Sequence, residues 1–140
     1  MTSISLSSIV TELSRDGSRQ AYLLLSDTEQ KAAEMYSLVK TEIVRRGIPH
    51  TVIDFTQGLA TLLDPSEYQR DSSLLLLENT ASVPANEMER LNTYIKQLTD
   101  FAAGSMLWYL SIDALGRLSS GYGNRARGAF QTITSLIPDE

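Results

Sequence analysis

A run of four leucines at positions 74–77 constrains this chain more than any other feature, because it ends in Glu78-Asn79 and precedes a long amphipathic segment. Four consecutive apolar residues bounded by polar ones are typical of a strand that is covered on both faces. After a short loop, apolar residues recur at helical spacing from Met88 to Leu98, and Gly104 follows them. Residues 72–104 therefore predict a buried strand followed by a helix.

The same unit recurs along the chain. Strands are expected at residues 21–25, 50–55, 73–78 and 106–111, and a short N-terminal helix at residues 5–16. Ser26 or Asp27 is expected to cap the helix after the first strand, and Gly47 with Pro49 to end it. Asn86 and Glu89 predict a capping box for the later long helix.

Weaker patterns fill the remainder of the chain. Residues 59–63 predict a weak helix, and residues 112–128 look irregular because they contain four glycines. Residues 131–137 fit a last strand or a short helix, and Thr132, Ile133 and Thr134 favour the strand.

Strands that alternate with helices predict a three-layer α/β sandwich with a central, mostly parallel sheet of about five strands. We expect one domain over residues 1–140: a helix at 5–16, a core at 20–111, and a Gly/Arg-rich loop with the last strand at 112–140. Ligands in such folds bind at the carboxyl ends of strands, which directs attention to Ser26, Thr56 and residues 78–80 and 111–113.

Composition narrows the classes of function. The 140 residues include no cysteine, which excludes disulfides, thiolate metal sites and a cysteine nucleophile. The net charge of −5 argues against general binding to nucleic acid. The apolar runs are too short to span a bilayer and the first eight residues carry no basic cluster, so we expect a cytoplasmic protein.

The order of these elements resembles the core of P-loop ATPases of the AAA+ class, of the replication-initiator and helicase-loader type. In that family the third strand ends in the Walker B acids, and the matching residues here are Leu74 to Leu77, Glu78 and Asn79. The segment from Asn124-Arg125-Ala126-Arg127-Gly128 to Pro138-Asp139-Glu140 resembles the family's arginine-bearing turn, final strand and boundary before the lid.

The phosphate-binding loop of the family is missing. Its Gly-x4-Gly-Lys-Ser/Thr pattern lets backbone N–H groups approach the phosphates. Here the turn reads Ser26-Asp27-Thr28-Glu29-Gln30-Lys31, without glycine and with two acids. Glu78 stands where the resemblance implies the magnesium-binding Asp, and Asn79 where it implies the catalytic Glu. We therefore expect no catalytic residue, no cofactor and no metal.

The resemblance then implies an inactive core that acts by docking to another copy, to a true ATPase or to a larger assembly. Arg117, Tyr122, Arg125 and Arg127 are the candidate partner-binding residues, because a planar guanidinium can bind a partner's phosphate bidentately as an arginine finger. The same residues also fit ordinary solvated arginines, or a grip on single-stranded nucleic acid by charge and stacking.

Two other classes of protein remain open. A receiver-like signalling domain has a similar alternation of strands and helices, but Glu78 stands where its phospho-accepting Asp is expected. Strand order separates the two: an ATPase-like core places the third strand between the second and fourth, with the fourth beside the first, whereas a receiver pairs its first strand with the second and third. The other class is a small enzyme or nucleotide-binding protein that uses the crevice at the carboxyl ends of the strands.

Overall fold

The structure, a computed structural model, describes residues 3–15, 17, 19–70, 74–101, 104–119 and 127–137. Its strands are β1 (Ser3–Ser5), β2 (Ala21–Ser26), β3 (His50–Asp54), β4 (Leu74–Glu78), β5 (Met106–Ser111), β6 (Gln131–Ile133) and β7 (Ser135–Ile137). Its α-helices are α1 (Leu6–Ser14), α2 (Glu29–Arg45), α3 (Met88–Phe101) and α4 (Ile112–Ser119). Short 3₁₀ helices are η1 (Leu59–Thr61), η2 (Pro65–Arg70), η3 (Thr80–Ser82), η4 (Ala85–Glu87) and η5 (Arg127–Ala129).

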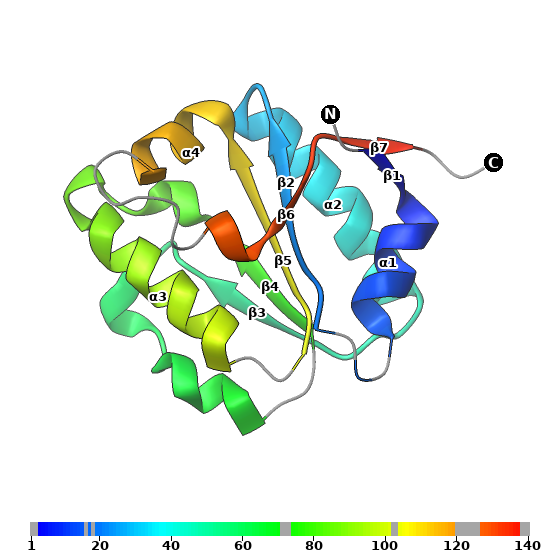
Figure 1. The fold of residues 1–140 in the computed structure, drawn as a ribbon, viewed down its shortest axis with the longest axis horizontal. Helices are drawn as coiled ribbons and strands as arrows, with labels where there is room; N and C mark the ends of the chain where they lie inside the picture. Colours follow the sequence, from blue (N-terminus) through cyan, green and yellow to red (C-terminus); the bar gives the residue numbers. More distant parts are fainter. Residues whose placement is uncertain are drawn as a thin grey trace.

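A five-stranded, all-parallel sheet with the order β3-β4-β5-β2-β6 forms the middle layer. Helices α1 and α2 lie on one side of it, and α3 and α4 on the other (Figure 1). The α/β sandwich expected from the sequence is therefore confirmed. Strand β4 lies between β3 and β5, and β5 lies beside β2, which is the order expected of an ATPase-like core. The pairing expected of a receiver, β2 with β3 and β4, is not the observed one.

The strands are buried on both faces because each face carries its own apolar layer. On the α3 side, Trp108 packs edge-on against Phe130 with ring centroids 5.2 Å apart, and its Nε1–H donates to Thr80 Oγ1 at 2.9 Å. On the α2 side, the neighbouring Tyr109 stacks on Tyr36 at 4.6 Å. The neighbouring residues Trp108 and Tyr109 thus lie on opposite faces of the sheet.

Helix α2 ends as its sequence predicts. Gly47 has a φ of +68°, its N–H donates to the carbonyl of Val44 at 3.0 Å, and the N–H of Ile48 donates to that of Ile43 at 3.1 Å. This pair of hydrogen bonds is the Schellman motif, in which glycine adopts the left-handed conformation without strain.

Several local predictions are wrong. Residues 112–119 form helix α4 instead of an irregular segment, because the Ser111 hydroxyl accepts from the Ala114 N–H at 3.1 Å and the apolar residues Ala114 and Leu118 are buried. The long helix α3 begins at Met88, after η4, so Asn86 lies in a 3₁₀ turn and is not its cap. The weak helix expected at 59–63 is the single 3₁₀ turn η1.

The last strand divides in two. Strand β6 pairs with β2 at the edge of the main sheet, whereas β7 leaves it and pairs in parallel with β1. The hydroxyl oxygens of Ser3 and Ser135 lie 2.7 Å apart in this small sheet. The first and last strands of the described chain, β1 and β7, therefore lie side by side (Figure 1). Within the part of the chain that the structure describes, no helix combines the length and apolar character needed to cross a bilayer.

Candidate functional site

The carboxyl ends of the parallel strands bring Ser26, Asp54, Glu78 and Ser111 to one edge of the sheet. Strand β2 leads to α2 on one face and β5 leads to α4 on the other, while Ser26 and Ser111 are paired in register. The loops after β2 and β5 thus diverge to opposite faces. In open α/β sheets this divergence opens the crevice in which ligands bind.

The turn after β2 follows the requirements of helix capping. Thr28 caps α2, and its hydroxyl accepts from the Lys31 backbone N–H at 3.1 Å. The expectation that Ser26 or Asp27 is the cap is therefore wrong by one or two residues. The helix begins at Glu29 and the turn contains no glycine, so this turn forms a side-chain helix cap and lacks the glycines of a phosphate-binding loop.

Glu29, in the first turn of α2, places its carboxyl group beside the carboxyl end of β5. Its Oε2 atom is buried without a hydrogen-bond partner in the described part of the chain. Burial raises the pKa of the Glu29 carboxyl, against the lowering effect of a hydrogen bond from the Ser111 backbone and of the positive charge on Arg117. The chain therefore places a carboxyl group of its own beside the end of β5.

Glu78, at the end of β4, is bonded to two side chains of α2. Its Oε2 accepts hydrogen bonds from the Tyr36 hydroxyl and from Lys40 Nζ, the latter at 2.6 Å. The side chain of Glu78 is 17% exposed and that of Lys40 is 35% exposed. Burial and the contact with Glu78 together raise the pKa of the Tyr36 phenol. An ion pair of this kind satisfies Glu78 without a metal.

Asn79 adopts the left-handed conformation, with φ of +64°. Its Nδ2 donates to Asp54 Oδ1 at 2.9 Å, and its backbone N–H donates to the Tyr109 hydroxyl at 3.3 Å. Asp54 also accepts from the Thr56 hydroxyl at 2.6 Å, and the hydrogen bonds from Thr56 and Asn79 lower its pKa. Asn79 thus joins the ends of β3, β4 and β5.

These contacts define what the edge can do chemically. Glu78 is neutralised by Lys40, Asp54 is engaged by Thr56 and Asn79, and Glu29 is partly buried. The described residues contain no group of three or more His, Cys, Asp or Glu side chains placed to hold a metal ion. The side chains at the edge are arranged to bind one another.

The arginine-containing segment is only partly described. Arg117 lies exposed in the last turn of α4, and its charge acts on Glu29 across the crevice. Tyr122 and Arg125 lie outside the described residues, and only the backbone of Arg127, at the start of η5, lies within them. Whether the four residues form one surface stays a prediction.

The sequence singled out Glu78 and Asn79 but not Tyr36, Lys40, Asp54 or Tyr109, which hold them. Tyr36 and Lys40 are four residues apart on α2 and so share one face of the helix. This spacing is the one sequence signal that could have grouped Tyr36 with Lys40. Without knowing that α2 packs over β2 and β5 and that its side chains reach the end of the neighbouring β4, the spacing alone does not point to Glu78.

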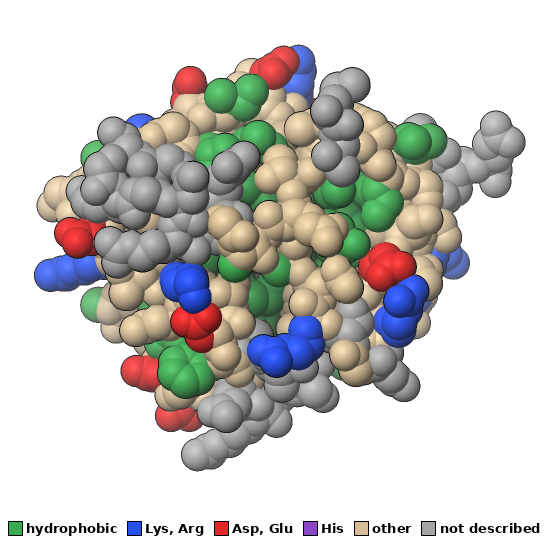
Figure 2. All heavy atoms as spheres, in the orientation of Figure 1, with side chains coloured by type: hydrophobic (Ala, Val, Ile, Leu, Met, Phe, Trp, Pro, Cys, Tyr) green, Lys and Arg blue, Asp and Glu red, His purple; other side chains and the backbone are tan. Residues whose placement is uncertain are grey.

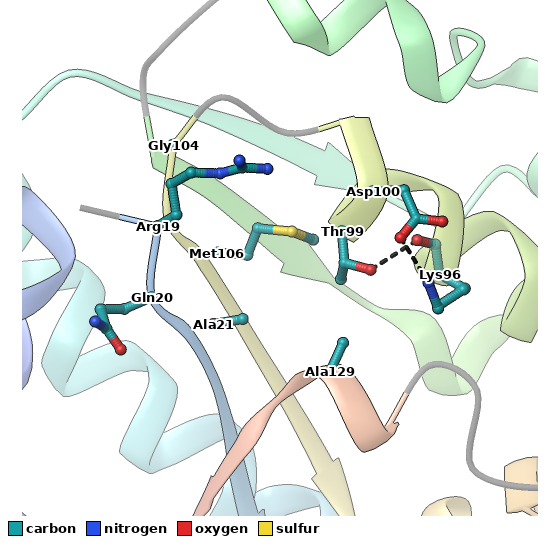
Figure 3. Close-up of a pocket in the computed structure, with 9 residues that line it drawn as sticks. All are labelled: Arg19, Gln20, Ala21, Lys96, Thr99, Asp100, Gly104, Met106 and Ala129. Carbon is teal, nitrogen blue, oxygen red and sulfur yellow. Dashed lines mark hydrogen bonds and ion pairs between the residues drawn. The ribbon is translucent and has the colours of Figure 1, made fainter. Parts of the chain in front are cut away.

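Other hollows lie away from this edge. One of about 350 Å³ lies at the amino-terminal end of the sheet and is lined by the starts of β2 and β5 and the end of α3 (Figure 3). Its Lys96 Nζ lies 2.5 Å from Asp100 Oδ1. An open groove of about 470 Å³ runs between η1 and α3. On the face shown in Figure 2, the described acidic and basic side chains are interspersed, without a continuous basic patch.

Comparison of the chain with models of known protein families and with curated protein sequences gives no match.

Proposed function

We propose that this chain is a non-catalytic protein-interaction module built on an inactive ATPase-like core, which acts by docking to a partner ATPase or to a larger assembly. The strand order β3-β4-β5-β2-β6 supports the ATPase-like core and counts against a receiver-like signalling domain. The partner, and the part that Arg117 plays in binding it, belong to the proposal.

The observation that carries the proposal is the Glu29 carboxylate at the end of β5. A carboxylate and a phosphate charge about 4 Å apart repel each other by about 4 kcal/mol near a protein surface. Asp27, exposed in the same turn, adds to this repulsion. A triphosphate at this edge would therefore meet negative charge where a phosphate-binding loop offers backbone N–H groups.

The bonding of Glu78 supports the same conclusion. A carboxylate that holds magnesium or activates a water needs a free lone pair directed at the ligand. Here Tyr36 and Lys40 already occupy Glu78 Oε2, and Asn79 offers no carboxylate. The acid at the end of β4 is thus bound to neighbouring side chains, and the residue after it is an amide.

Calorimetric titration of the chain with ATP and magnesium tests the proposal, together with an assay for released phosphate. We expect neither heat of binding nor phosphate release. Glu29→Gln is the informative variant, because it removes the charge and keeps the shape of the side chain. Binding of ATP by the wild-type chain, competed by ADP, would contradict the proposal.

A second experiment addresses docking. The chain is used as bait in its native cell, and any ATPase that it retains is assayed for turnover with wild-type chain and with Arg117→Ala. Altered turnover with the wild-type chain and a smaller change with Arg117→Ala would support a role for Arg117. Equal turnover in the two cases would exclude that role.

A further inference from the structure

The two edges of the main sheet are protected to different degrees. At one edge, β6 is only three residues long, and the chain then leaves the sheet to pair with β1. Short edge strands and departing chains prevent pairing with other molecules. At the other edge lies the five-residue strand β3, which pairs only with β4 in this sheet.

The backbone of β3 presents hydrogen-bonding groups to the open edge. The Phe55 N–H donates to the Glu78 carbonyl at 3.0 Å, and the Pro49 carbonyl accepts from the Leu74 N–H at 3.4 Å. Residues 49 and 55 thus point toward β4, and the alternation of a strand gives Thr51 and Ile53 the same direction. His50, Val52 and Asp54 therefore direct their N–H and C=O groups away from the sheet.

The side chains of β3 protect this edge only weakly. Exposed edges are commonly guarded by charged side chains, above all lysine, by proline or by a bulge, and Asp54 is the one acidic or basic side chain of β3 other than the histidine. Strand β3 reads His-Thr-Val-Ile-Asp, with three consecutive β-branched residues and neither lysine nor proline. Val52 is 39% exposed on the α2 side of the sheet, although valine at a strand centre is commonly covered.

We propose that the β3 edge is a homodimer interface, in which β3 pairs antiparallel with β3 of a second copy about a two-fold axis at Val52. Val52 then lies opposite Val52 of the partner subunit, and His50 opposite Asp54 of the partner subunit. Thr51 lies opposite Ile53 of the partner subunit. The two sheets become one continuous sheet.

Backbone geometry and charge favour this register. The residues that point outward, His50, Val52 and Asp54, fall opposite one another, and each such pair exchanges two N–H···O=C bonds. The imidazole of His50 meets a carboxylate, so no like charges face each other. An axis at Asp54 would instead oppose two carboxylates, which is destabilising. The strand is self-complementary, and for this reason a second copy is the occupant.

The interface is small. One strand pair buries less than the roughly 800 Å² per partner of a standard interface, so the dimer is expected to form reversibly and with increasing protein concentration. This inference does not rest on the proposed function, because a dimer at β3 leaves the carboxyl ends of β2 and β5 unchanged. A chain that stays monomeric would contradict the dimer alone, and a chain that binds ATP would contradict the proposed function alone.

Sedimentation velocity of the full chain over a concentration series up to the millimolar range tests the interface. We expect the sedimenting mass to rise from 15.5 kDa toward twice that value. Val52→Lys places two like charges at the axis and should weaken association severalfold. The matched control is Leu38→Lys, which adds the same charge at a 56% exposed position on α2. It should leave association unchanged.

A charge-swap experiment tests the register. His50→Asp should weaken self-association because two carboxylates then meet at each pair beside Val52. Asp54→Lys should weaken it because the carboxylate that faces the imidazole is lost. An equimolar mixture of the two variants should associate again, since each introduced charge meets its opposite and the other pair is wild-type. Circular dichroism confirms that each variant folds, which matters for Asp54 because it also binds Asn79.

A wild-type chain that stays monomeric at all concentrations would overturn the inference. So would a dimer that Val52→Lys leaves intact, or a mixture of the charge-swap variants that associates no better than either variant alone. A chain that captures a strand of another protein at β3 but does not self-associate would overturn it as well.

Discussion

At the scale of single residues, the clearest prediction concerns the largely buried ion pair of Lys40 and Glu78. Lys40→Met is expected to lower the free energy of unfolding by about 1–3 kcal/mol, because it leaves the largely buried Glu78 without its cationic partner. Urea unfolding at neutral pH measures this change. A double-mutant cycle with Glu78→Gln isolates the energy of the pair.

The matched control is Lys96→Met. It breaks the pair with Asp100, whose side chains are 40% and 54% exposed, and exposed pairs on a helix contribute less than about 0.5 kcal/mol. Equal effects of the two lysine substitutions would show that burial of Glu78 has no energetic consequence.

Glu29 gives a second prediction at this scale. Burial raises the pKa of Glu29 in the folded chain above its value in the unfolded chain. The ionised carboxyl is therefore less favourable in the folded state than in the unfolded state, and its ionisation lowers stability at neutral pH. Glu29→Gln should therefore raise the free energy of unfolding at pH 7, by less than about 1 kcal/mol because the side chain keeps contact with water. The gain should shrink as the pH falls below the ordinary glutamate pKa of about 4.3. Urea unfolding midpoints of wild type and Glu29→Gln, compared at pH 7 and below the ordinary glutamate pKa, test the sign of the stability change.

At the scale of elements, replacing glycine by alanine should have opposite effects on stability at Gly47 and at Gly116. Gly47→Ala should lower the free energy of unfolding by about 1 kcal/mol, because its φ of +68° strains any residue with a Cβ although space is open there. Gly116 lies inside α4 with open space around it, so Gly116→Ala should raise stability by up to about 1 kcal/mol. Thermal unfolding of both variants measures the difference. A loss of stability in both would mean that α4 requires glycine for another reason.

The same two positions show what sequence can predict about an element. Gly47 and Pro49 end α2 through local backbone geometry, which a short stretch of sequence contains. Helix α4 escaped prediction because glycine lowers local helix propensity, whereas burial of Ala114 and Leu118 against residues distant in the sequence stabilises the helix. The four core strands of the sheet were predicted within one residue at each end, since a continuous apolar run is itself the local signature.

At the scale of the whole molecule, alternation of strands and helices predicted a parallel sheet, because crossovers join parallel strands. Two strand orders fitted the same alternation, and only the fold distinguished them. The candidate site is less predictable than the sheet. Glu78 and Tyr36 are 42 residues apart and Asn79 and Asp54 are 25 apart, so their contacts depend on how α2 and β3 pack beside β4.

The tyrosines give a prediction that involves the entire fold. Burial is the largest cause of a raised pKa for Tyr22, Tyr36, Tyr94 and Tyr109. Each phenol stays protonated in the folded chain above pH 10, where the unfolded chain ionises. Their contribution to stability is therefore complete below about pH 10 and is lost as the pH rises above it. Phenolate absorbance should rise together with the loss of the far-ultraviolet circular dichroism signal, in one cooperative transition.

Tyr36→Phe separates this effect from general alkaline damage. The variant loses the hydrogen bond to Glu78 and should be less stable than wild type at neutral pH by about 1–2 kcal/mol. Above pH 10 the difference in stability between wild type and variant should narrow by as much as about 1.4 kcal/mol per pH unit. Wild type loses stability there because Tyr36 ionises in the unfolded chain but not in the folded one, whereas the variant has no phenol at position 36. Urea unfolding of both chains between about pH 8 and pH 11 measures the gap. A constant gap, or full tyrosine ionisation near pH 10 in a chain that keeps its helical signal, would show that water reaches these phenols in the folded state.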